Sequence, residues 1–140
     1  MGKEFIPYEI AVELKELGFD EPCFGYYLCK NSAFGIYIEI TSNWLDLLPY
    51  DSSSCKAPLY QQAFEFFRDK YNLHHSISVN QRSCKYHFKI RTIEYESDLK
   101  PFGDSKIISE DGPRKKYEDI ELDCLVKLIE IVKKRNNDEV

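Results

Sequence analysis

The 140-residue sequence lacks the short motifs that mark common nucleotide and metal sites. It contains no CxxC, HExxH, GxGxxG or Walker-type run, and each of these patterns supplies a ligand spacing or a close backbone approach that its site requires. No stretch approaches the ~20 apolar residues that a membrane-spanning helix needs. The opening "MGKEFIPYEI" has charges and a proline where a secretory signal has an apolar run. We therefore expect a cytoplasmic protein without a metal or cofactor.

A positive net charge is also missing. The chain has 19 Lys and Arg against 24 Asp and Glu, which gives a net charge of −5. Nonspecific binders of phosphate backbones owe their affinity to clustered positive charge, so this balance disfavours such a role for the surface as a whole. A local basic face is still compatible with it.

The cysteines do not form a disulfide framework or a zinc site. Their number is odd, they are spread over the whole chain, and most fall within apolar patterns, where a free thiol behaves as a small hydrophobe. They are Cys23, Cys29, Cys55, Cys84 and Cys124. No spacing pairs one of them with a base, and burial raises a thiol pKa rather than activating it. We therefore expect reduced thiols and no enzymatic activity.

Apolar and aromatic residues, in contrast, are plentiful. A hydrophobic fraction of 43% with 14% aromatics is ample for the core of one domain, and domains typically run to roughly 100–150 residues. The patterns predict a single α+β domain over residues 1–140, in the order helix–hairpin–helix–hairpin–helix, with an antiparallel sheet covered by helices.

Two of the three predicted helices lie near the ends of the chain. The first covers 7–17, with Ile10, Leu14 and Leu17 as its apolar stripe and Gly18 as its stop. The last covers 117–134, with acidic residues in its first turn and basic ones in its last. Its apolar residues repeat at helical spacing: Ile120, Cys124, Leu128 and Ile131, beside Leu125, Ile129 and Val132. The tail 135–140 is expected to fray.

The middle helix, in the stretch "QQAFEFFRDKYNLHHSISV", is the most aromatic part of the chain. Tyr60, Phe64, Phe67 and Tyr71 recur at helical spacing, and such a stripe is typical of a core. His74 and His75 follow where a strand must begin. Adjacent strand residues point to opposite faces, so we expect two ordinary strand residues rather than one metal or acid–base site.

The two predicted hairpins carry the candidate binding residues. The first has strands at 23–29 and 34–40 around "KNSA"; a two-residue turn places Tyr26 opposite Tyr37, an aromatic patch suited to a protein partner or to self-association as a homodimer. The second turns at "NQRS", after which Cys84, Tyr86, Phe88 and Ile90 alternate with the basic stripe. That stripe consists of Lys85, His87, Lys89 and Arg91. It is either a track for nucleic acid or an acidic partner, or a solvated strand face whose lysines protect an edge.

The remaining stretches are predicted as connections. Residues 41–58 have some apolar content, in "NWLDLLPY", and a serine run, and residues 96–116 are polar and punctuated by Pro and Gly. We expect the second stretch to be a long mobile loop that includes a short strand at "KII".

The stretches "LKELGFDEPCFGYY", "APLYQQAFEFFRDKYNL" and "YEDIELDCLVKLIEIVKK" resemble small uncharacterised proteins encoded in phage and prophage regions of gut bacteria. The resemblance covers the first helix and hairpin, the middle helix and the last helix. It implies a phage-type accessory protein in a bacterial host cell, and it carries no assigned activity. Together with the patterns, it predicts a non-enzymatic protein that acts by binding a protein or itself; the alternative is a nucleic-acid-associated protein using strand 85–91.

Overall fold

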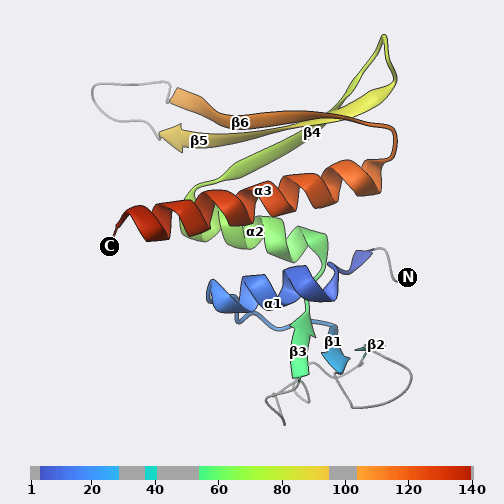
Figure 1. Cartoon of the computed structure of the whole chain (residues 1–140), viewed down its shortest axis with the longest axis vertical. Helices are drawn as coiled ribbons and strands as arrows, with labels where there is room; N and C mark the ends of the chain where they lie inside the picture. Colours follow the sequence, from blue (N-terminus) through green and yellow to red (C-terminus); the bar gives the residue numbers. More distant parts are fainter. Residues whose placement is uncertain (1–3, 29–36, 41–53, 95–103, 140) are drawn as a thin grey trace. The chain divides into compact units, whose positions relative to one another are not determined.

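The computed structural model describes residues 4–28, 37–40, 54–94 and 104–139. Over these residues the chain forms three helices and two three-stranded antiparallel sheets, which confirms the α+β class (Figure 1). The elements are α1 (Tyr8–Glu16), β1 (Gly25–Leu28), β2 (Tyr37–Ile40), β3 (Ser54–Ala57), α2 (Tyr60–Tyr71), β4 (His74–Asn80), β5 (Lys85–Glu94), β6 (Asp104–Arg114) and α3 (Tyr117–Asp138). The chain divides into two compact units, Met1–Ala63 and Phe64–Val140. The single domain over 1–140 stays a prediction.

The predicted order of helices and hairpins is incomplete, because each hairpin has a third strand. β3 lies within the predicted connector 41–58, so that loop assignment is wrong over β3. β6 lies within the predicted mobile loop 96–116; it includes the short strand predicted at "KII", but it has 11 residues, so the loop assignment is wrong over the rest of β6. In β3, Cys55 and Ala57 are buried and Lys56 between them is half-buried, a pattern too short to predict a strand. The side chains of β6 from Ser105 onward are almost all exposed. β6 is held by its backbone pairing with β5, which apolar periodicity cannot report.

The first sheet has the strand order β2-β1-β3, and its register differs from the prediction. Tyr26 is paired with Glu39, and Leu28 with Tyr37, a shift of two residues from the predicted Tyr26–Tyr37 pair. The predicted turn at "KNSA" lies outside the described residues. A shift of two residues keeps each side chain on the same face of the sheet and changes only its cross-strand neighbour.

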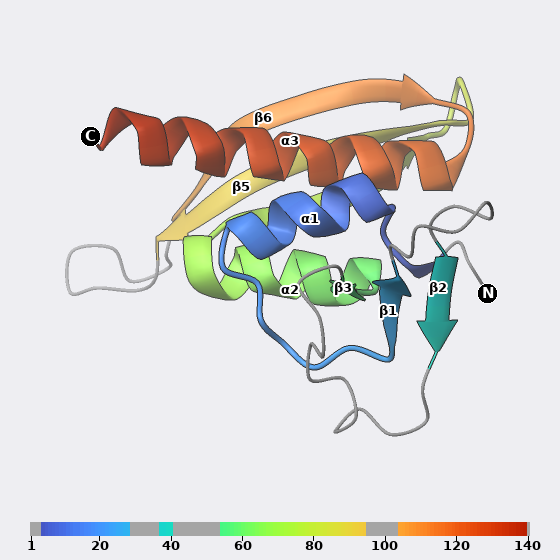
Figure 2. The same cartoon turned by 60° about the horizontal axis from the view of Figure 1, so that its bottom comes forward.

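The first unit is organised around α1, β1 and β3 (Figure 2). The helix ends as predicted: Gly18 has a φ of 95°, and the Phe19 amide donates to the Leu14 carbonyl over 3.0 Å, the bond that a residue at positive φ permits. Leu14 is buried as predicted, but Ala11 rather than Ile10 or Leu17 completes the buried face. The Tyr27 hydroxyl donates to the Ile6 carbonyl.

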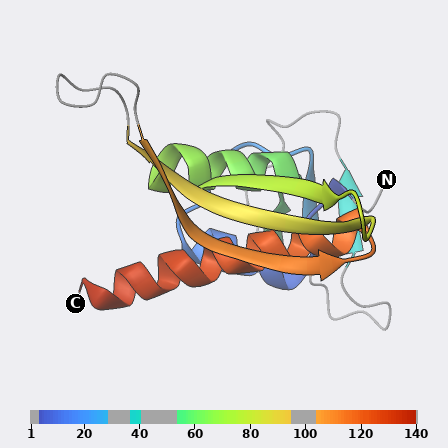
Figure 3. The same ribbon diagram turned by 90° about the horizontal axis from the view of Figure 1, so that it is seen from above.

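The second unit has a meander of β4, β5 and β6 with α3 on one face (Figures 1 and 3). The predicted α3 stripe is confirmed except at Ile131, which is half-buried. Its buried residues are Ile120, Cys124, Leu125, Leu128, Ile129 and Val132. The helix runs through Asp138, so the predicted frayed tail from residue 135 begins too early.

The aromatic stripe of α2 supplies the middle of this core. Phe64 and Phe67 are buried at 4% and 0% exposure, as predicted for the stripe, whereas Tyr71 is half-buried. The Phe64 ring stacks on His75 of β4 with 3.7 Å between centroids. The Arg135 guanidinium of α3 donates to the Tyr71 carbonyl over 3.4 Å. The stretch from α2 into β4 is therefore part of the hydrophobic core.

Candidate functional site

The two faces of β5 differ sharply, because its residues alternate in chemistry. Phe88 and Ile90 are 2% and 0% exposed and face the core. The residues that alternate with them along β5 are half-buried and point the other way, since successive strand side chains alternate. We call the surface formed by Lys85, His87, Lys89 and Arg91 the basic sheet face. Of the four residues predicted on the core side, Phe88 and Ile90 are buried, Tyr86 is half-buried and Cys84 is exposed.

Neighbouring strands surround the basic sheet face with mostly neutral residues. On β4, Ser76 is paired with Lys89 and Ser78 with His87. On β6, Glu110 is paired with Lys89, and Ile107 with Arg91. Figure 3 shows the three strands from the side opposite α3, and no described segment of this unit lies over them. The face thus has three side chains with full positive charge, Lys85, Lys89 and Arg91, beside one carboxylate from β6.

Position 112 of β6 requires a glycine, because the His87 side chain lies against the backbone there. Its φ is 151°, and a Cβ at this position would lie 2.5 Å from His87 Nδ1 and 3.0 Å from the Tyr86 carbonyl oxygen. The pairing of β5 with β6 shifts register between Tyr86 and Phe88. The bulge and the absent side chain together let the imidazole lie against the backbone of β6. The sequence signal was the Gly-Pro dipeptide, which the prediction treated only as loop punctuation.

Arg91 has a donor that lacks an acceptor. Its Nε is buried and has no hydrogen-bond partner among the described residues. An unsatisfied buried donor typically costs about 1–3 kcal/mol. The guanidinium as a whole is the kind of group that binds carboxylate and phosphate oxygens well.

The two adjacent histidines have separate surroundings, as the strand geometry predicts. His75 stacks on Phe64, and its burial, with Arg68 and His74 nearby, lowers its pKa to about 4. His74 Nε2 lies 2.9 Å from Asn72 Oδ1. Asn72 itself has a φ of 54° at the end of α2 and donates from Nδ2 to the Ile93 carbonyl over 2.8 Å. His75 is thus a neutral core residue, and His74 belongs to the chain's turn into β4.

The predicted aromatic patch is not formed as a cross-strand pair. Tyr26 is half-buried and lies between Glu39 and Lys56 in the register of its sheet. Tyr37 is paired with Leu28, and the side chain of Tyr37 lies outside the described residues. The patch therefore provides no geometry on which to build a site.

The thiols differ from one another in exposure. Burial raises the pKa of Cys23 and of Cys124 to about 12, which leaves both protonated at neutral pH. Cys84, predicted on the core side of β5, is instead exposed in the turn with a φ of 54°. The tight turn after Asn80, in which the Cys84 amide donates to the Asn80 carbonyl over 2.8 Å, removes Cys84 from the alternation.

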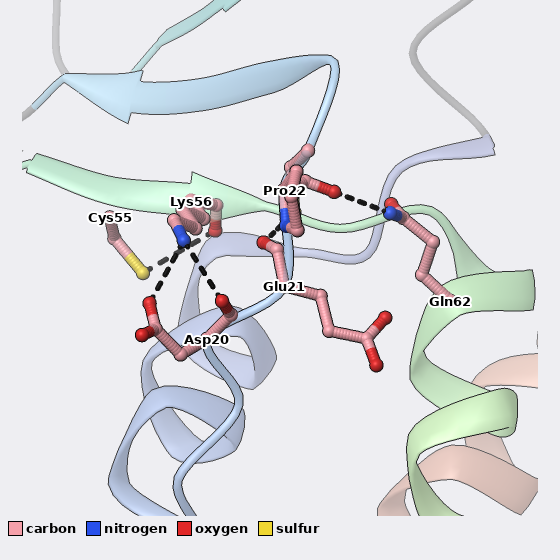
Figure 4. A network of polar contacts seen from close by, with 7 residues as sticks. Asp20, Glu21, Pro22, Cys55, Lys56 and Gln62 are labelled. Atoms are coloured by element: carbon pink, nitrogen blue, oxygen red, sulfur yellow. Dashed lines mark hydrogen bonds and ion pairs between the residues drawn. The ribbon is translucent and has the colours of Figure 1, made fainter. Parts of the chain in front are cut away.

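A polar network in the first unit is structural (Figure 4). The Lys56 ammonium of β3 lies 2.9 Å from Asp20 Oδ1, and Gln62 donates to the Pro22 carbonyl over 2.8 Å. The ammonium also lowers the pKa of Asp20. These contacts fasten the segment after α1, and an exposed ion pair of this kind contributes little by itself.

The described residues contain no group of three or more His, Cys, Asp or Glu placed to hold a metal ion. None of the three described helices is both long and apolar enough to cross a membrane. Comparisons with protein-family models, with curated proteins and with solved structures found no match to this chain. The resemblance to phage-encoded proteins stays a prediction.

Proposed function

We propose that this chain is a non-enzymatic binding protein whose basic sheet face contacts the sugar–phosphate backbone of nucleic acid. The observation that carries the proposal is the alternation along β5, which sends Phe88 and Ile90 into the core and Lys89 and Arg91 out of it. The cations are thereby fixed on a sheet rather than on mobile tails. The phage or prophage context implied by the resemblance is kept as part of this proposal.

The dimensions of the row suit a backbone contact. Lys85 and Arg91 are six residues apart on one strand, which is about 20 Å at a rise of ~3.3 Å per residue. Nucleotides rise by about 3.4 Å along one strand of a duplex, so the row spans about six of them. Successive side chains of this face are two residues, or about 6.6 Å, apart, which corresponds to about two nucleotide rises, and the contact that we propose is with phosphates. We therefore expect binding without sequence preference.

The local charge differs from that of the whole chain. The chain carries −5, yet the basic sheet face has three cations and only Glu110 as a paired carboxylate. The rest of the protein is negatively charged, so it repels nucleic acid and keeps the binding affinity low. A contact confined to this face is then strongly salt-dependent, because each neutralised phosphate releases counterions.

The experiment is a fluorescence-anisotropy titration of labelled 20-nucleotide single strands and duplexes at low salt. Lys89→Gln should weaken binding several-fold, because it removes one cation that neutralises a phosphate and with it part of the electrostatic affinity. Lys134→Gln on the exposed side of α3 removes the same charge elsewhere and should change little. Equal effects of the two substitutions, or no binding of the unmodified protein at low salt, would refute the proposal; in the second case, acidic proteins become the ligand class to test.

A further inference from the structure

The two edges of the β4-β5-β6 sheet are built differently. β6 carries the features that keep an edge strand from pairing with another chain: charged residues such as Lys106 and Glu110, Pro113, and two register shifts against β5. β4 reads "HHSISVN", with no Asp, Glu, Lys, Arg or Pro. It pairs with β5 over its whole length without a shift.

An edge without such protection is an open template for pairing. In the part of the chain that the structure describes, β4 ends its sheet, and no other strand pairs with its outer side. Val79 on this strand is 52% exposed, and Ser76 and Ser78 are exposed beside it. Natural sheets seldom leave a regular, uncharged edge of this kind uncovered.

We propose that β4 pairs antiparallel with β4 of a second copy of this chain, about a two-fold axis at Ile77. The strand is self-complementary about this residue. Antiparallel pairing centred on Ile77 sets Ser76 opposite Ser78 and His75 opposite Val79. No acidic or basic residue meets a like charge across the axis, and like charges directly opposite are what oppose such pairing. The exposed Val79 gains a cross-strand neighbour.

The expected strength of the dimer follows from its size. A strand of seven residues buries far less than the roughly 800 Å² per partner of a stable interface. We therefore expect a weak, reversible dimer that forms in the micromolar range. Closed two-fold pairing uses the β4 edge of both copies, and the protected β6 edges stop further growth.

The pairing also completes a larger binding surface. A two-fold axis perpendicular to the sheet keeps the basic sheet faces of both copies on the same side. Their β5 strands are then three strand spacings apart, about 14 Å at ~4.8 Å each. Two rows of cations would line one continuous six-stranded surface. This last step rests on the proposed function, whereas the pairing itself does not.

The test compares two double substitutions that add the same charge to the same sheet face. Ser76→Lys with Ser78→Lys places like charges opposite each other across the proposed axis. Ser105→Lys with Ile107→Lys adds two lysines at the β6 edge, where Ser105 and Ile107 are paired with Ile93 and Arg91. Sedimentation velocity is measured without nucleic acid from one to several hundred micromolar.

The unmodified protein and the β6 variant should dimerise with the same dissociation constant, and the β4 variant should dimerise at least tenfold more weakly. A protein that stays monomeric throughout, or two variants that behave alike, would overturn the proposal. Hydrogen exchange of the unmodified protein gives a second measurement that needs no variant. Amides of β4 should gain protection as concentration rises, and unchanged β4 exchange in a sample that dimerises would place the interface elsewhere. Because nucleic acid is absent, failure here leaves the proposed function separately testable.

Discussion

The two faces of β5 show how one strand can carry a core and a surface with different roles. Phe88 and Ile90 lie under α3 with almost no exposure, while Lys89 and Arg91, one residue away, lie on the face that no described segment of their unit covers. The difference between faces comes from alternation alone. Substitutions on the core face should therefore change stability, and those on the basic sheet face should change binding.

The largest expected effect is on the core side. Phe67→Ala should destabilise the fold by about 3–5 kcal/mol, because it removes a fully buried ring from a site that can collapse only in part. This is a large part of the roughly 5–15 kcal/mol that a domain possesses. Thermal melting and soluble yield would report it. A variant that melts within two or three degrees of the parent would show that α2 is not in the core.

Gly112→Ala should have the next effect, of about 1–3 kcal/mol, because the new Cβ would meet His87 and the φ of 151° strains any side chain. Chemical denaturation measures it. The double change with His87→Ala should recover part of the loss, since it removes the nearest atoms. If the double variant is no more stable than Gly112→Ala alone, the whole loss of stability comes from the backbone conformation of residue 112.

His75 should make stability depend on pH. Its pKa of about 4 in the folded state lies below the ordinary 6.5, so the unfolded chain binds the proton first. The stabilisation is complete above pH 6.5 and is lost as pH falls toward 4. The side chain is partly exposed, and we expect screening to leave about 1–2 kcal/mol of loss across this window.

Denaturation series at pH 7 and pH 4.5 would measure this dependence. His75→Phe keeps the ring stacked on Phe64 and should flatten the His75 part of it. If the parent and the His75→Phe variant lose equal stability on acidification, the buried imidazole is not the cause.

The confirmed features are those in which burial repeats with a regular period. The α3 stripe, Phe64 and Phe67 of α2, and the alternation around Phe88 follow from residue spacing, because each apolar position must face the same core. The basic sheet face was predictable for the same reason, as the complement of that alternation. Its exposure could not be predicted, since that depends on which helices cover the sheet.

The missed features depend on backbone geometry rather than on apolar pattern. β6 is an edge strand of exposed residues joined to β5 by its backbone, and Cys84 leaves the β5 alternation because of one residue at positive φ. The first hairpin has a register two residues away from the predicted one, and a shift by two leaves the alternation of faces unchanged, so the apolar pattern could not exclude it. The difference between the β4 and β6 edges could not be predicted, because most of β6 was predicted to be a loop.

The most direct test of the central claim is the salt dependence of nucleic-acid binding when the basic sheet face is neutralised without touching the core face. Lys85→Gln and Lys89→Gln combined should change stability by less than about 1 kcal/mol, since surface substitutions usually stay within about 0.5 kcal/mol each. Against single strands, the slope of log affinity on log salt should become shallower by about 1.4, from two phosphate contacts at ~0.7 each. A slope equal to that of the unmodified protein, at unchanged stability, would contradict the account.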